Sequence, residues 1–377
     1  MRQPRRSTTA APWLAPTLLG LFVGLCLLVA PLRAGEGSAP QPAEVMQQWV
    51  AALRDFGTSQ PMSDRLGPDA RQQLEQDLAR AEAALASGHW LGSLRPYASV
   101  ADRLAQAIVR FETDPIRDLE GLEVEQQALR AQLERLGSPL RGKDQRPAAL
   151  QALFERAYDT ATGYLVSSGL QGREAGLGAG IYNLKVARSH ANLARLLASL
   201  QAPAPELPVG DVPGLTAYLD RLEVELLERY QPPLTQERHA TFIGLSATLK
   251  LGRELRDEDF QLGALEYALS VARSLAQFDG ADTQGVPGRQ VLRDRLAGWD
   301  ETLASLDVDV TLPGLWLEDA REALDNDSVG NAEELADAHA ILGRVLDDYF
   351  DSFERAAVAS ASTPQSVTVT LVRWPFT

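Results

Sequence analysis

Residues 261–276 read QLGALEYALSVARSLA and residues 90–105 read WLGSLRPYASVADRLA, so the two stretches agree at eight of sixteen positions. A third stretch, GLGAGIYNLKVARSHA at 176–191, has the same Leu-Gly pair, with a valine nine residues after its leucine as in the other two. The Leu-Gly pairs begin at residues 91, 177 and 262, which are 86 and 85 residues apart. Near-equal intervals with a matched internal register predict a tandem repeat with a period of about 85 residues.

Each repeat is predicted to hold three helices. Apolar residues recur at helical spacing from Ala43 onward, and segments rich in Gly, Pro, Asp or Asn interrupt them at the intervals expected of helix connections. The first and second helices of a repeat would form a pair, with the Leu-Gly residues near the start of the second helix. The third helix would connect this pair to the next repeat. A glycine early in the second helix would let the preceding helix approach closely. The fold class predicted is therefore all-α, with tandem three-helix repeats in an α-solenoid-like array or bundle.

The predicted organisation has a helical domain over residues 43–356 between two short flanking segments. Its boundaries are units near 63–140, 145–231 and 235–307, capping helices over 314–356, a flexible lead at 35–42, and a linker and strand-like tail at 357–377.

Residues 1–34 have the pattern of an export signal. Basic MRQPRR precedes a long apolar run, and a small residue, Ala34, ends it. We expect cleavage after Ala34 and a periplasmic or secreted location in a bacterial envelope. An uncleaved N-terminal membrane anchor is the alternative, because the apolar run approaches the length of a bilayer span.

Composition excludes several classes of function. The one cysteine is Cys26, so disulfides, thiolate metal sites and cysteine nucleophiles are excluded from the chain after Ala34. Residues 35–377 hold 32 basic and 51 acidic side chains, a net charge of −19. Nucleic acid is therefore not an expected partner, since its binding needs a basic face. Contact with a membrane is expected only through an uncleaved N-terminal segment.

The acidic segment DNDSVGN offers a weak candidate for a metal site. Asp325 and Asp327 fall at the first and third positions of a calcium-loop pattern, with Gly330 at the sixth. Ala336 occupies the twelfth position, where a bidentate glutamate belongs, so a solvated turn before the next helix is the preferred interpretation. No cofactor is expected.

Other side chains that could carry chemistry favour structural roles. No histidine has another histidine or a carboxylate on its own helical face, so all four are predicted to be core or boundary residues with a hydrogen-bond partner. Gly172, Gly176 and Gly180 are four residues apart, which predicts a smooth strip for close packing on one helix rather than a phosphate loop. Trp299 and the other helix-associated tryptophans are predicted to line the core or a groove.

The C-terminal segment QSVTVTLVRWPFT has the alternation of a single β-strand. A lone strand leaves its backbone donors and acceptors unpaired, so it must pack or pair with something. It could fold back on its own helical array, add to the sheet edge of a partner protein, or serve as a sorting signal. The candidate partner-binding residues of this segment are Val367, Val369, Leu371, Trp374 and Phe376.

The functional hypothesis is an exported, non-enzymatic helical-repeat protein that acts as a protein-binding or scaffold module of the cell envelope. The alternative is a periplasmic protein that binds a small ligand or a divalent metal through acidic pairs such as Asp325 with Asp327, or Asp347 with Asp351. An all-helical enzyme is the third hypothesis, and no spacing in the sequence favours it.

Overall fold

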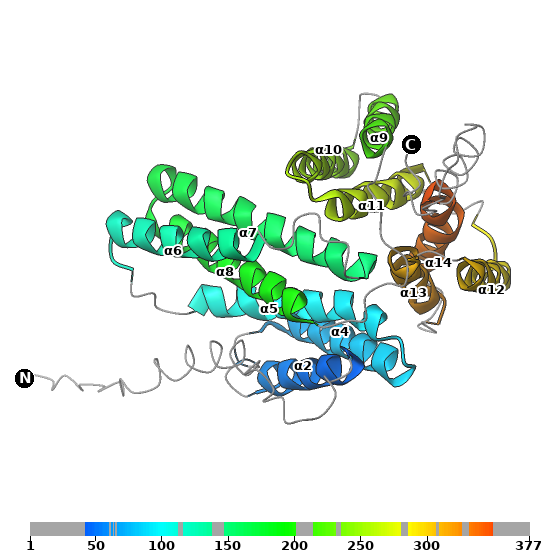
Figure 1. Ribbon diagram of the computed structural model, residues 1–377, viewed down its shortest axis with the longest axis horizontal. Helices are drawn as coiled ribbons and strands as arrows, with labels where there is room; N and C mark the ends of the chain where they lie inside the picture. The colour runs from blue at the N-terminus through cyan, green and yellow to red at the C-terminus, as the bar shows by residue number, and fades with distance from the viewer. Residues whose placement is uncertain are drawn as a thin grey trace, which may run out of the picture.

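The computed structural model is helical in every element that it describes (Figure 1). The described residues are 42–59, 62, 64, 66–111, 116–137, 147–200, 214–230, 235–279, 286–306, 309–325 and 332–349. The prediction of an all-α protein is confirmed for these residues, none of which belongs to a strand. The strand-like tail and the N-terminal signal lie outside the described residues.

Twelve α-helices, one 3₁₀ turn and one π-helical segment make up the described chain. Their bounds are α2 Pro42–Gly57, α4 Pro68–Ala86, η1 Trp90–Ser93, α5 Leu94–Phe111, α6 Leu119–Gly137, α7 Ala148–Glu174, α8 Leu177–Ser199, α9 Leu215–Arg229, α10 Gln236–Asp257, α11 Gln261–Asp279, α12 Arg289–Ser305, α13 Thr311–Asp325, α14 Ala332–Ala340 and the π-helical η2 Ile341–Val345.

Four helical hairpins share one hydrophobic core. The pairs are α4–α5, α7–α8, α10–α11 and α13–α14, and α7–α8 is the most extensively packed. Helix α7 also packs on α6, α11 and α13, so it lies near the middle of the molecule (Figure 1). The first and last hairpins meet as well, because α13 contacts η1.

The connecting helices pack with the hairpin that follows them. Helix α6 packs on α7 and α8, α9 on α10 and α11, and α12 on α13, α14 and η2. The sequence boundaries instead placed each of these helices with the hairpin before it. The contacts do not establish a repeat, and the 85-residue period stays a prediction.

Two helix starts are bound by side chains from distant parts of the chain. The backbone N–H of Ala148, the first residue of α7, donates to Asp309 Oδ2 at 2.9 Å, and the N–H of Ala149 donates to Thr311 Oγ1 at 3.2 Å. At the start of α11, the N–H of Gly263 donates to Glu155 Oε2 at 2.5 Å. Buried helix termini need such acceptors because their first N–H groups have no partner within the helix.

Gly172 and Gly180 allow two helices to pack closely together and do not form a strip on a single helix. Helix α7 ends at Glu174, and Gly176 adopts a φ of +102° in the turn to α8. Gly172 and Gly180 therefore face each other across the hairpin, where a Cβ on Gly180 would lie 2.8 Å from the Gly172 Cα. The packing role is confirmed, while the single helical strip was wrong because the turn falls in the middle of it.

The three Leu-Gly glycines have different surroundings. A Cβ on Gly263 would lie 2.7 Å from the Glu155 Cβ and 3.0 Å from Cδ1 of Leu255 in the preceding helix. Gly92 lies in η1 with ordinary spacing to its neighbours, and Gly178 has nothing within 4 Å of a built Cβ. Close packing of neighbouring residues therefore explains the glycine at only one of the three Leu-Gly pairs, the one that contains Gly263.

Candidate functional site

A cluster of arginines and carboxylates joins the hairpins at the centre of the molecule. The Arg95 guanidinium of α5 lies 2.5 Å from Glu266 Oε1 of α11, binds Asp319 of α13, and covers the Trp316 ring at 4.1 Å from its centroid. Glu266 is fully buried and also accepts a hydrogen bond from Arg156 of α7 at 3.1 Å. Helices from all four hairpins therefore meet at these side chains.

The arginines and carboxylates of this cluster bind one another, although the buried Glu266 Oε2 has no hydrogen-bond partner within the described residues. Burial alone lowers the pKa of Arg95, but Asp319 and Glu266 outweigh burial and raise it above its ordinary value. Arg95 consequently stays protonated at every pH at which the protein is folded. A buried ion pair of this kind fixes how the helices dock against one another.

A polar cleft of about 360 Å³ opens beside the cluster, between α4, α5, α11, α13 and α14. In its wall, Arg273 Nε lies 2.5 Å from Asp337 Oδ1, and Asp77 accepts hydrogen bonds from Ser99 at 2.7 Å and from Arg103 at 3.2 Å. The cleft is lined by paired charges, which again tie neighbouring helices together.

Two carboxyl groups of α7 are held in the α7–α11 interface with unusual pKa values. Burial raises the pKa of Glu155 to about 7, even though the N–H groups of Gly263 and Leu262 and the amide of Gln151 bind it. Burial likewise raises the pKa of Asp159 to about 6. These groups change charge near neutral pH, and both of them contact α11.

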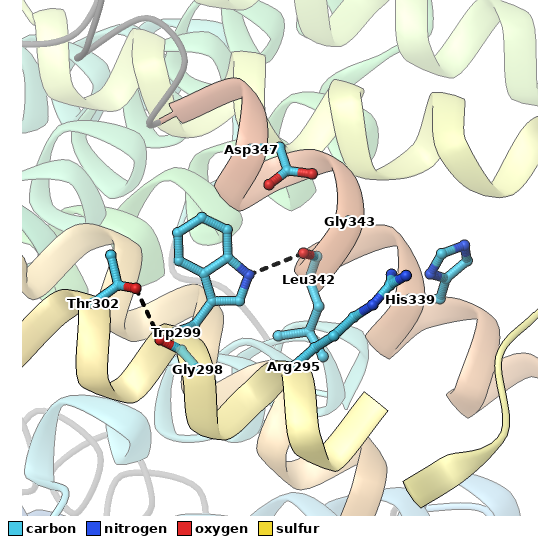
Figure 2. A pocket seen from close by; sticks show the side chains of 8 residues that line it. All are labelled: Arg295, Gly298, Trp299, Thr302, His339, Leu342, Gly343 and Asp347. Atoms are coloured by element: carbon cyan, nitrogen blue, oxygen red, sulfur yellow. Dashed lines mark hydrogen bonds between the residues drawn. The ribbon is translucent and has the colours of Figure 1, made fainter. Parts of the chain in front are cut away.

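A groove of about 600 Å³ lies between α12 and the segment that runs from α14 through η2 (Figure 2). The Trp299 indole Nε1 donates to the Leu342 carbonyl at 3.0 Å. A π-helical segment leaves the regular α-helical hydrogen-bond pattern, and such segments are frequent at functional sites. The groove lining is Arg295, Gly298, Trp299, Thr302, His339, Leu342, Gly343 and Asp347.

Three large apolar side chains on the packed helices α6 and α7 are exposed, and we call Leu119, Val166 and Leu170 the α6–α7 ridge. Leu119 is 46% exposed, Val166 54% and Leu170 55%. Leu119 reaches toward α7, because its Cδ2 lies 3.8 Å from a Cβ built on Gly172. Val166 and Leu170 are four residues apart, so they share one face of α7.

The predicted site residues are only partly within the described chain. Asp325 is the last residue of α13, and its exposed carboxylate lies 3.7 Å from the Arg293 guanidinium. Asp327 and Asp351 lie outside the described residues, as do all five candidates of the tail. Among the described residues, no group of three or more His, Cys, Asp or Glu side chains is placed to hold a metal ion.

The histidines differ from one another. His190 confirms the prediction of a partnered boundary residue, since its Nε2 lies 3.2 Å from Asp102 Oδ1 of α5 and its ring stacks on Tyr164. His89 and His239 are exposed, contrary to the prediction of core or boundary positions, because each lies at or near a helix start. His89 nevertheless has a partner, since its Nδ1 lies 3.4 Å from Glu318 Oε2. His339 lies in the groove, and its Nδ1 has no hydrogen-bond partner in the described part of the chain.

Sequence reasoning missed the central charge cluster, Glu155 and the polar residues of the groove, although the prediction that Trp299 lines the core or a groove is confirmed. Their members are far apart in the chain, as the 171 residues between Arg95 and Glu266 illustrate, so no local spacing indicates them. The described helices include none that is long and apolar enough to cross a membrane. Comparison with protein-family models, curated proteins and solved structures found no match to this chain.

Proposed function

We propose that the protein is an exported, non-enzymatic helical module that binds a protein partner in the cell envelope. The observation that carries the proposal is the α6–α7 ridge, which places three large apolar side chains in solvent on adjoining helices. Large apolar side chains exposed on adjoining helices are a feature of many protein interaction sites. The acidic composition after Ala34 favours a partner that is not nucleic acid.

The repeat hypothesis supports a scaffold role. In α6, α9 and α12, buried or half-buried side chains recur at the same offsets of seven and eleven residues from the first. We propose that the repeating unit is a connecting helix followed by a hairpin, which shifts the sequence boundaries by one helix. The aligned positions are Leu122, Leu129 and Leu133 in α6, Leu215, Leu222 and Leu226 in α9, and Leu292, Trp299 and Leu303 in α12.

Site-specific photo-crosslinking tests the binding role. A photoreactive phenylalanine would be placed at Val166, at Leu170, and at the exposed Gln171 as a control. Gln171 follows Leu170 directly, so it points about 100° away on the helix. We expect one discrete crosslinked partner from envelope extract at the two ridge positions and none at Gln171, and we expect Leu119→Asp to abolish both crosslinks. A monomeric protein with no crosslink above that of the Gln171 control would refute the proposal.

Export is tested separately by fractionating cells and sequencing the N-terminus of the isolated protein. A chain that begins at Gly35 in the exported fraction is the expected result.

A further inference from the structure

The groove of Figure 2 holds two polar groups without the partners that such groups usually have. Arg295 forms no ion pair within the described residues, although the protein has a net charge of −15. His339 Nδ1 accepts or donates no hydrogen bond there. Most arginines of the described chain are bound to carboxylates, whereas Arg295 is exposed and, like Arg130, has no carboxylate partner among the described residues.

The two groups converge on one point. Arg295 Nη1 and His339 Nδ1 each lie 3.5 Å from the position that a Cβ on Gly343 would occupy, and Gly343 leaves this space open. Figure 2 shows the Arg295 side chain extending from α12 toward His339 on α14. Burial and the nearby Arg295 charge lower the pKa of His339, so its imidazole is neutral at pH 7 and the single positive charge here is that of Arg295. In the tautomer that carries the proton on Nδ1, His339 is a hydrogen-bond donor beside the Arg295 guanidinium, and the two donors match the two oxygens of a carboxylate.

The rest of the groove determines what the carboxylate is attached to. The Trp299 indole forms a wall on the α12 side, and its bond to the Leu342 carbonyl fixes the ring (Figure 2). An aromatic wall favours a flat or apolar body. Asp347 lies across the groove and adds a negative charge, which disfavours ligands that carry two or more negative charges. A volume of about 600 Å³ suits a small molecule.

We propose that this groove binds a small aromatic monocarboxylate. Arg295 and His339 bind its carboxylate, and its ring lies against Trp299. The site is separate from the α6–α7 ridge, so it does not depend on the protein-binding proposal.

The test is a titration of the purified protein followed by NMR of the tryptophan indole N–H groups, with the Trp299 signal assigned from Trp299→Phe. The probes are phenylacetate, phenylacetamide, acetate and inorganic phosphate. We expect saturable shifts of the Trp299 signal with phenylacetate, and affinities weaker by about tenfold or more for phenylacetamide, which lacks the charge, and for acetate, which lacks the ring.

Variants connect the binding to the named residues. Arg295→Gln should weaken phenylacetate binding by about tenfold or more, the loss of one charge-assisted pair. Arg293→Gln, on the same helix but outside the groove lining, should leave it unchanged, and circular dichroism would verify that both variants fold. The proposal is overturned by an absence of saturable shifts at Trp299, by phosphate or acetate binding as tightly as phenylacetate, or by equal affinities of the Arg295 and Arg293 variants.

Discussion

Protonation of Glu155 should make the stability of this protein depend on pH around neutrality. Its pKa is about 7 in the folded protein, against an ordinary value of 4.5. The folded chain therefore holds this proton more tightly than the unfolded chain does. The free energy of unfolding should fall as pH rises from about 4.5 to about 7 and then level off, because above pH 7 both states are ionised. The contribution of this one group is about 3 kcal/mol.

Glu155→Gln isolates that contribution. Glutamine has nearly the same shape, its Oε1 can accept from the Gly263 N–H, and it does not ionise. Urea unfolding at pH 5 and pH 8 should show that the wild type loses more stability between the two pH values than the variant does, by up to about 3 kcal/mol. Glu174→Gln, at the exposed end of the same helix, should keep the wild-type difference. Asp159 titrates in the same direction, so Asp159→Asn should also reduce the pH dependence, by less because its carboxyl is partly exposed.

The reasoning would be refuted if the wild type and Glu155→Gln lost equal stability between pH 5 and pH 8. That result would mean that the groups around Glu155 keep its carboxyl as acidic in the folded protein as in the unfolded chain.

Two further comparisons use matched variants and urea unfolding. Gly263→Ala should lower the free energy of unfolding by about 1–3 kcal/mol, because the new Cβ meets Glu155. Gly178→Ala, at the equivalent Leu-Gly pair, should stay within about 0.5 kcal/mol of the wild type because nothing lies near its Cβ position. Equal effects of the two substitutions would contradict the packing role of Gly263. Arg95→Leu should lower the free energy of unfolding by about 3 kcal/mol or more, because it removes the charge that pairs with the buried Glu266. Arg253→Leu should lower it by less than about 1 kcal/mol, because the partners of Arg253, Asp220 and Glu223, are exposed. Similar losses for the two arginine variants would show that the central cluster contributes little.

Local signals in the sequence predicted the helices well. Apolar periodicity and helix-breaking residues indicated an all-helical chain, because a helix that packs on one side needs an apolar stripe and an end. Individual boundaries were less certain: α7 continues to Glu174 and α13 begins at Thr311, both within segments expected to be breaks. At the start of α10, Thr235 accepts a hydrogen bond from the Arg238 N–H, a cap formed within one turn of the chain that was not among the sequence predictions. The signal between Gly172 and Gly180 was also local, although the sequence did not show that a turn lies within it.

The candidate sites could not be predicted in the same way, because the residues that contact one another in each site are far apart along the chain. The start of α7 has no local cap, and its acceptor, Asp309, lies 161 residues later. From the sequence alone, Glu155 would be taken for a surface residue of an acidic helix. Its burial becomes apparent only when α11 packs against α7. The groove depends on the departure of η2 from α-helical geometry, for which the sequence ILGRV carries no obvious mark.

The hydrogen bonds that cap the start of α7 show how the four hairpins are arranged relative to one another. In an open solenoid each repeat contacts only its neighbours. Here α13 binds the start of α7 through the segment that precedes it and also contacts η1, so the last hairpin packs on the first and the second. The charge cluster around Arg95 lies at this junction and ties helices of all four hairpins. The hairpins are therefore closed where α13 meets α7 and η1, and α6 lies at the opposite end of the molecule from α13 (Figure 1). The apolar side chains of the α6–α7 ridge are about half exposed among the described residues, which is what the proposed binding of a partner needs.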